Sequence, residues 1–197
     1  MNEGYIKFQY KIVDGAYPKY DEVAELIKLR THFFDLGLIG YDGKVSFGNI
    51  SKRINETEFI ISASNTGLQR VLSPEDFVIV FSVELNKNFV LCKGKFPPSS
   101  EALTHFSIYR TFEFANYAVH FHNYSIWKRL KNVLPTTNKN YSYGSIELAN
   151  SISQLKWQIS GTKGVGVIVL GGHESGLFIF GKEDKLILEE INKLISG

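Results

Sequence analysis

The sequence contains a single cysteine and lacks long apolar runs. Cys92 is the only cysteine in 197 residues, which excludes a disulfide framework and favours a reducing compartment. No apolar stretch approaches the roughly 20 residues that a membrane-spanning helix needs. The segment Met1–Lys11 mixes polar and aromatic residues and has no apolar core of a signal peptide. We therefore expect a cytoplasmic protein that does not contact a membrane.

The sequence also lacks an excess of one charge. Its 22 basic residues are scattered and nearly balanced by 20 acidic ones, for a net charge of +2, which gives no electrostatic argument for a nucleic-acid partner. A Gly-x-Ser-x-Gly elbow and a phosphate-binding P-loop are both absent. With 44% hydrophobic and 21% charged residues, residues 1–197 are predicted to form one globular domain.

Apolar residues recur at two spacings along the chain. A spacing of three or four residues predicts helices, and short β-branched runs bounded by turn residues predict strands. The predicted helices are Asp21–Leu36, Ser100–Phe114, Tyr124–Lys131, Gly144–Trp157 and Glu183–Ile195. The predicted strands are Val45–Ile54 with an interruption at Gly48–Ser51, Phe59–Ser62, Phe77–Val83, Asn88–Leu91, Tyr117–Asn123, Val165–Leu170 and Leu177–Phe180. Their alternation predicts an α/β fold with a central sheet covered by helices, and the hairpins disfavour a purely parallel sheet.

Two histidines lie two residues apart in one predicted strand. Because a strand turns successive side chains to opposite faces, His120 and His122 are expected on the same face, where they form half of a divalent-metal site. Such a pair is equally consistent with ordinary polar histidines on a half-exposed strand. His173 lies in a glycine-rich turn between the last two strands, where it is either a turn residue or a third ligand. Three ligands with an open position are typical of a catalytic metal.

A carboxylate and several small polar loops accompany the histidines. Glu101 is expected in the first turn of a helix, where the helix dipole stabilises an acidic residue, and that position alone favours this structural role over one as a general acid or base beside a metal. The loops Gly48–Ser51, Ser64–Gly67 and Ser99-Ser100 could present amides and hydroxyls to a phosphate, although each taken singly is more often a turn.

The order of these motifs resembles a known family. Gly48-Asn49-Ile50-Ser51 is followed by the Ser64–Gly67 loop, by Ser99-Ser100-Glu101 with His105 and Tyr109, by Val119-His120-Phe121-His122, by Tyr143–Ala149 and by Gly172–Gly176. From about Asp21 to Gly181 the chain resembles the class II aldolase/adducin family, which includes fuculose-phosphate and rhamnulose-phosphate aldolases, a ribulose-phosphate epimerase and a methylthioribulose-phosphate dehydratase. The resemblance implies a three-layer α/β/α sandwich with a mainly antiparallel central sheet.

The resemblance also implies roles for individual residues. His120, His122 and His173 match the metal ligands, usually of zinc, with Mn²⁺, Co²⁺ or Fe²⁺ as alternatives. Glu101 matches the catalytic acid/base. The residues that match the family's phosphate-binding positions are Asn49, Thr66, Gly67, Ser99 and Ser100. The implied reaction is retro-aldol cleavage of a small ketose phosphate through a metal-stabilised enediolate, and the implied assembly is a homotetramer.

Two other functions fit the same motifs. One is an epimerase or dehydratase that uses related metal chemistry, and the other is an adducin-like binding module without catalysis. Family aldolases carry a longer segment after the His-x-His strand that supplies a catalytic tyrosine. Here Tyr124, Tyr141 and Tyr143 lie in the corresponding region, and none of them aligns with that tyrosine.

Overall fold

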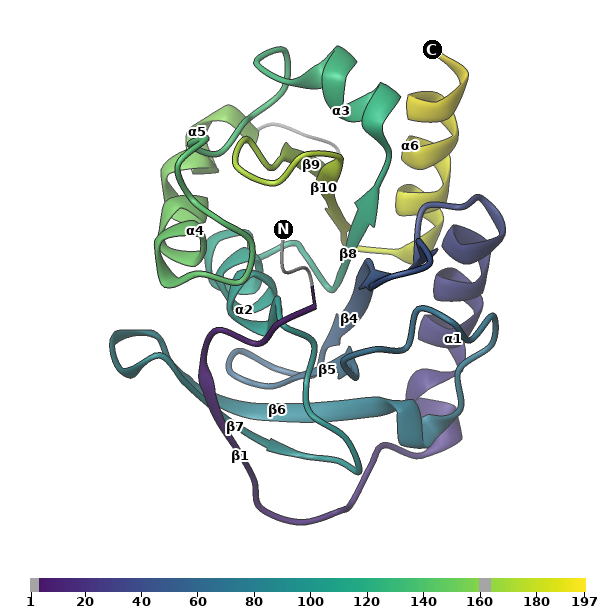
Figure 1. Cartoon of the computed structure of the whole chain (residues 1–197), viewed down its shortest axis with the longest axis vertical. Coiled ribbons are helices and arrows are strands. Elements are labelled where there is room, and N and C mark those ends of the chain that lie inside the picture. Colours follow the sequence, from purple (N-terminus) through teal and green to yellow (C-terminus); the bar gives the residue numbers. More distant parts are fainter. Residues whose placement is uncertain (1–3, 160–163) are drawn as a thin grey trace.

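One large sheet organises the chain in the computed structural model, which describes residues 4–159 and 164–197 (Figure 1). Its strands are β1 (Gln9–Ile12), β4 (Asn49–Arg53), β5 (Phe59–Ser62), β6 (Phe77–Glu84), β7 (Phe89–Lys93), β8 (Tyr117–His122), β9 (Val165–Val169) and β10 (Gly176–Gly181). They are hydrogen-bonded in the order β1-β7-β6-β5-β4-β8-β10-β9. Two short strands, β2 (Gly40–Tyr41) and β3 (Ser46–Phe47), pair separately.

Most neighbouring strands in this sheet run antiparallel. Among the described strands, β1 and β7 form the parallel pair, and the β9–β10 hairpin is antiparallel as predicted. The mainly antiparallel sheet predicted from the sequence is thereby confirmed. Strand β8 lies between β4 and β10, so both of its edges are paired and its side chains have fixed directions.

Helices cover both faces of the sheet. They are α1 (Tyr20–Asp35), α2 (Ala102–Thr111), α3 (Tyr124–Leu130), α4 (Ile146–Ser151), α5 (Lys156–Ile159) and α6 (Asp184–Ser196), with 3₁₀ turns η1 (Pro74–Asp76), η2 (Leu85–Lys87) and η3 (Ile152–Leu155). Helices α2, α4 and α5 gather with η3 on one face, while α1 and α6 lie side by side on the other (Figure 1). The three-layer α/β/α sandwich is therefore confirmed.

The alternation of β8 divides its side chains between two cores. Val119 and Phe121 are fully buried in the core that includes α1 and α6, and Phe121 meets Phe33 edge to face with ring centroids 5.8 Å apart. Burying a side chain of that size stabilises the fold by roughly 2–3 kcal/mol. A shift of one residue in register would exchange the two faces, so this burial also fixes which way His120 and His122 point.

Three features differ from the elements predicted from sequence. Strand β1 and the short strand β2 were not predicted. The segment Gly144–Trp157 is three short helical pieces, α4, η3 and α5, instead of one helix. Within it, the hydroxyls of Ser151 and Ser153 donate to the carbonyls of Leu148 and Asn150, at 2.7 and 3.0 Å. These bonds reach back three residues and compete with the regular helical ladder.

The described residues contain no helix that is long and apolar enough to cross a membrane. The first three residues of the segment Met1–Lys11 lie outside the described ranges.

Candidate metal centre

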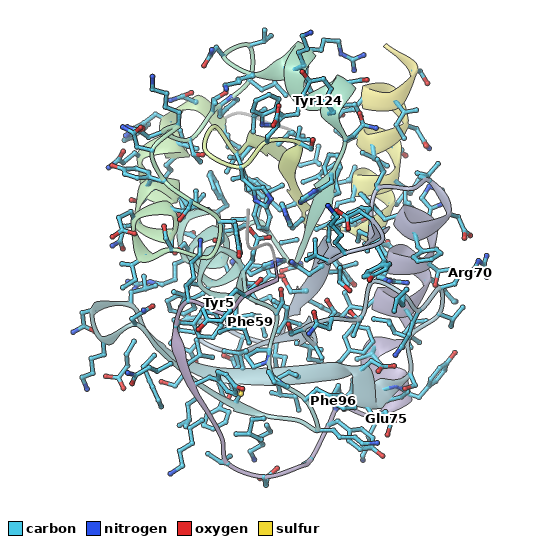
Figure 2. The ribbon with its side chains drawn as sticks, in the orientation of Figure 1. Tyr5, Phe59, Arg70, Glu75, Phe96 and Tyr124 are labelled. Atoms are coloured by element: carbon cyan, nitrogen blue, oxygen red, sulfur yellow. The ribbon has the colours of Figure 1, made fainter. Side chains whose placement is uncertain are left out.

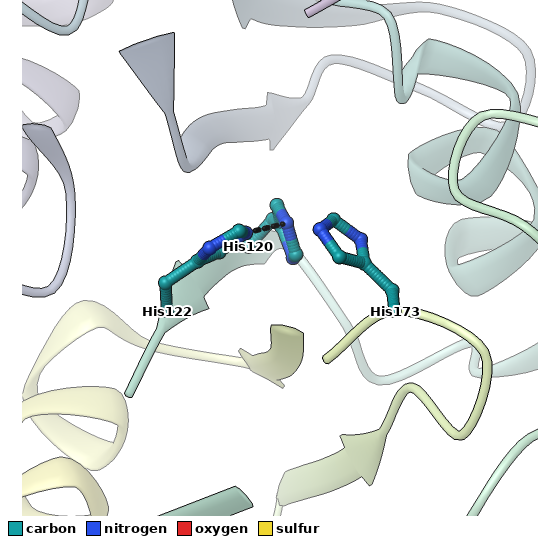
Figure 3. Close-up of side chains that lie close together, drawn as sticks. All are labelled: His120, His122 and His173. Atoms are coloured by element: carbon teal, nitrogen blue, oxygen red, sulfur yellow. Dashed lines mark hydrogen bonds between the residues drawn. The ribbon is translucent and has the colours of Figure 1, made fainter. Parts of the chain in front are cut away.

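Three imidazoles converge at the end of β8. Each of His120, His122 and His173 offers a ring nitrogen, and these nitrogens all lie within 4.8 Å of one another (Figure 3). His120 and His122 come from one face of β8, as their spacing predicted. His173 comes from the β9–β10 turn, which the pairing of Gly176 with His122 brings beside them. The sequence-predicted ligand set is therefore assembled in space.

A glycine at position 176 leaves room for the close approach of His173. A Cβ atom on Gly176 would lie 3.0 Å from Cγ of His173 and 3.1 Å from Cε1 of His120. Carbon atoms at these separations would push the two rings apart. The glycine in the hairpin thus permits the three rings to share one small space.

The hydrogen bond of His120 to the backbone fixes which nitrogen faces the cluster. Nδ1 of His120 lies 3.0 Å from the carbonyl oxygen of Leu177, which can only accept, so Nδ1 carries the proton. Nε2 of His120 therefore faces the cluster, and it lies 3.0 Å from Nε2 of His122. A backbone carbonyl that orients an imidazole in this way is the usual support of a metal-ligating histidine.

Glu101 reaches the cluster from the start of α2. It is 2% exposed, its Oε2 lies 3.0 Å from Nε2 of His120, and its Oε1 makes no hydrogen bond and lies 3.9 Å from Nδ1 of His173. Burial raises the pKa of this carboxyl, but the neighbouring imidazoles, His120 foremost, lower it to about 2. Glu101 is therefore ionised at neutral pH.

This donor set fits a divalent cation. Nε2 of His120 lies 3.0 Å from an ionised oxygen of Glu101, so a positive charge, carried by a proton on this nitrogen or by a bound cation, is needed between them. Burial, together with the charges of the other imidazoles, lowers the pKa of His122 to about 2, which leaves this ring in the neutral form that metals bind. Three imidazoles and one carboxylate are ligands that zinc and related divalent metals accept.

A small polar cavity of about 30 Å³ adjoins the cluster. Four of the five positions matched to phosphate binding line it, namely Asn49, Thr66, Ser99 and Ser100. Gly67 is absent from the described lining residues. Its amide donates to Oγ of Ser46 at 3.2 Å, and a Cβ there would lie 2.0 Å from the carbonyl oxygen of Gly40, so Gly67 serves the packing of this loop. Phosphate binding by these residues stays a prediction.

Two aromatic residues contact the histidines of the site, and only one of them, Tyr143, was considered from the sequence. Phe47 stacks on His122 with ring centroids 5.2 Å apart. The ring centroids of Tyr143 and His173 are also 5.2 Å apart. Of the three tyrosines considered from the sequence, Tyr143 lines the cavity, whereas Tyr124 is half exposed on α3 (Figure 2). Phe47 directly precedes the Gly-Asn-Ile-Ser motif, and that adjacency was the available signal.

The N-terminal segment also contributes to the site, and no motif indicated it. Gly4 lines the cavity. Nζ of Lys7 lies 3.8 Å from the centre of the Tyr143 ring and donates to the Tyr143 carbonyl at 2.8 Å. Lys7 therefore helps to hold Tyr143 in its position against His173.

Comparisons with known proteins agree with this architecture. A family model described as "Class II Aldolase and Adducin N-terminal domain" matches residues 24–183. Among solved structures, L-fuculose 1-phosphate aldolase aligns with a TM-score of 0.63 and 22% identity, covering 90% of this chain and 84% of that one. YgbL from Klebsiella pneumoniae, described by the alternatives aldolase, epimerase and decarboxylase, aligns with a TM-score of 0.64 and 15% identity over 90% and 88%. An aldolase II superfamily protein from Pseudomonas syringae aligns at 0.60 and 15% over 91% and 75%.

Proposed function

Because this chain belongs to the class II aldolase and adducin family, we propose that it is a metal-dependent lyase that cleaves a small ketose phosphate by retro-aldol chemistry. The observation that carries the proposal is the convergence of three imidazoles and an ionised, buried carboxylate beside a cavity lined by small polar side chains. Acid–base chemistry next to a cation requires this combination of groups.

His120, His122 and His173 would hold the divalent cation, zinc or alternatively Mn²⁺, Co²⁺ or Fe²⁺. When bound, the cation supplies a Lewis acid that offsets negative charge on the oxygens of the substrate. The protein's own contribution is to keep His122 neutral and to orient the ring of His120. Burial lowers the pKa of His122, and the Leu177 carbonyl fixes the ring of His120.

Glu101 would move the proton. Its carboxylate is ionised, and one oxygen has no hydrogen bond, so it can take a proton from the substrate hydroxyl that becomes the aldehyde oxygen. When the carbon–carbon bond breaks, its electron pair stays on the fragment that carries the original carbonyl. The proton is then returned to that carbon, which balances the reaction without another reactant.

The polar side chains around the cavity would hold the phosphate and orient the sugar. Asn49, Ser99 and Ser100 line the cavity together with Glu101, and both serines are buried just before α2. A phosphate held at a distance from the reacting carbons would orient those carbons relative to the cation and Glu101. We also propose a homotetrameric assembly, which the family resemblance implies.

An epimerase or dehydratase is the second candidate. The same carboxylate that returns a proton to carbon in a lyase can remove one from carbon in these enzymes, so the geometry of Glu101 serves both. A non-catalytic binding module would not need a buried carboxylate with one oxygen that makes no hydrogen bond, because an incompletely satisfied buried charge costs stability.

The test is to incubate zinc-loaded protein with a panel of ketose phosphates and detect released dihydroxyacetone phosphate, with Glu101→Gln as the control. A lyase releases the three-carbon product in the wild type and not in the variant. Isomerised or dehydrated sugar without cleavage would instead identify the second candidate. A protein that binds neither metal nor substrate would contradict both enzymatic functions and favour the binding module.

A further inference from the structure

A chain of buried hydrogen bonds extends from the catalytic carboxylate into the core. Asn49 Nδ2 lies 3.3 Å from Glu101 Oε2, and Asn49 Oδ1 lies 2.5 Å from His105 Nε2. His105 Nδ1 lies 2.6 Å from Ser51 Oγ, which lies 2.6 Å from the hydroxyl of Tyr109. All five side chains are at most 8% exposed, and those of Ser51 and His105 are fully buried.

Elementary donor and acceptor chemistry gives this chain one direction. The amide nitrogen of Asn49 can only donate and an ionised carboxylate can only accept, so the amide oxygen must face His105. That oxygen only accepts, and therefore His105 carries its proton on Nε2. Burial lowers the pKa of His105 to about 3, so the ring is neutral at pH 7 and Nδ1 accepts. The hydroxyl of Ser51 therefore donates to Nδ1 of His105, and its oxygen accepts a hydrogen bond from the hydroxyl of Tyr109.

We propose that His105 is a positioning residue that, with Ser51 and Tyr109, locks the amide of Asn49 with its nitrogen toward Glu101 and the cavity. An amide rotated by half a turn would place its oxygen against the carboxylate and offer an anion an acceptor in place of a donor. Two contacts oppose that rotamer: the amide oxygen would face the ionised Glu101 with no proton between them, and Nε2 of His105 would lose its acceptor. The proposal rests on the proposed function only in treating Asn49 and Glu101 as parts of a substrate site.

The position of His105 suits this role. Its ring meets Phe178 edge to face at 5.0 Å between centroids, which holds the imidazole plane between α2 and β10. Asn49 pairs with His120 across β4 and β8, so the locked amide lies next to the metal ligands. The role therefore acts through Asn49 and involves no contact between His105 and the cation.

The tautomer of His105 tests the proposal directly. In protein labelled with ¹⁵N at histidine, without metal or substrate at pH 7, we expect His105 to show a protonated Nε2 and a bare Nδ1. Ser51→Ala removes the donor to Nδ1 and should populate the opposite tautomer. Ser107→Ala is the matched control. Ser107 is a buried serine like Ser51, but it lies in α2 and its hydroxyl makes no hydrogen bond. A proton on Nδ1 in the wild type, or an unchanged ratio in Ser51→Ala, would overturn the proposal.

Binding of inorganic phosphate to the zinc-loaded protein gives a second measurement. His105→Phe keeps an aromatic side chain but removes both nitrogens, and should weaken phosphate binding about tenfold, the effect of losing one well-placed donor. His105→Gln keeps a donor toward Asn49 and should restore most of the affinity, while Ser107→Ala should match the wild type. Equal binding by His105→Phe and the wild type would contradict the proposal. If His105→Phe does not fold, Ser51→Ala takes its place in this comparison.

Failure of this inference and failure of the proposed function are distinguishable. The tautomer is measured without substrate, so the expected tautomer in a protein that cleaves no ketose phosphate would overturn the lyase proposal alone. The opposite tautomer in an active lyase would overturn the positioning role alone.

Discussion

A buried carboxylate that stays ionised is the residue on which the proposed chemistry depends. Burying such a charge is costly unless opposite charge and hydrogen bonds accompany it. Glu101 receives one hydrogen bond from Asn49 and has imidazole neighbours, yet its Oε1 lacks a bond. An incompletely satisfied charge in a cavity wall is typical of a functional group, because a purely structural role would favour full satisfaction.

Replacing this carboxylate should separate catalysis from metal binding. Glu101→Gln keeps the size of the side chain but removes its ability to take up a proton, so turnover should fall by about 10²–10⁴. Zinc content should remain near that of the wild type because the three histidines are unchanged. Turnover on the reactive ketose phosphate and zinc content are measured on the same preparation. A loss of less than about tenfold in turnover would remove Glu101 from the acid–base role.

The buried histidine His105 should make stability depend on pH. Its pKa is lowered from 6.5 to about 3 in the folded protein, so between these values the unfolded chain binds the extra proton. The contribution of the neutral ring is fully present above pH 6.5 and is lost as the pH falls toward 3. The free energy of unfolding should therefore decrease by up to about 1.4 kcal/mol per pH unit from this residue alone.

Urea denaturation of the metal-free protein at pH 7 and pH 5 checks this expectation, with His105→Gln as the comparison. Glutamine does not titrate, so the variant should lose less stability than the wild type over the same interval. Parallel pH dependence in the two proteins would show that His105 is not neutral in a buried environment.

At the scale of elements, tight backbone contacts set the position of the helix that carries Glu101. Gly144 adopts a φ of +63°, and a Cβ there would lie 2.5 Å from the carbonyl oxygen of Ser100. The loop before α4 thus presses directly against the residue that precedes Glu101. A side chain at position 144 would push this backbone apart.

Alanine at position 144 should destabilise the fold more than alanine at position 37. Gly37 has a similar φ of +69° but open space around it, so Gly37→Ala reports backbone strain alone. Gly144→Ala adds the clash with Ser100 and should cost at least about 1 kcal/mol more. The difference is measured from urea midpoints of the two variants. Equal costs would mean that the contact with Ser100 does not constrain the loop.

The elements best predicted from sequence were those with strong local patterns. The β-branched run of β5 and the alternation of β8 were predicted because neighbouring residues alone specify them. Strand β1 was missed because its four residues, Gln9–Ile12, are mostly exposed and gain their regular structure from pairing with β7 at the sheet edge. The division of Gly144–Trp157 into three pieces arises from serine hydroxyls that an apolar periodicity does not register.

In the candidate site, too, the residues that belong to local motifs were predicted and those that depend on long-range contacts were not. The His-x-His spacing and the family motifs indicated the residues that converge. The aromatic contacts of Phe47 and Tyr143 depend on how loops pack, and the clamp by Lys7 joins residues 136 positions apart in sequence. Long-range contacts of this kind leave no periodic signal in the chain.

At the scale of the whole molecule, the sandwich brings distant segments to one point. The three histidines proposed as ligands come from β8 and from the turn before β10, and the carboxylate comes from the start of α2. A cation that binds these groups links three segments that are separate in the unfolded chain. Metal binding should therefore be coupled to global stability.

Zinc should raise the free energy of unfolding. At a free zinc concentration 100 times the dissociation constant, a single site that exists only in the folded state contributes about 2.7 kcal/mol. Thermal unfolding with zinc and after chelation measures this difference. His122→Ala should show a much smaller zinc effect, and an identical increase in that variant would place the stabilising site elsewhere.

The most direct test of the account is the number of zinc ions bound per chain in the wild type and in His173→Ala, measured by elemental analysis of purified protein after dialysis. His32→Ala is the matched control, because it also removes one histidine but lies in α1, away from the cluster. We predict one zinc per chain in the wild type and in His32→Ala, and a loss of most of the metal in His173→Ala. One zinc per chain in His173→Ala, or none in the wild type supplied with zinc, would contradict the three-histidine centre on which the proposed chemistry depends.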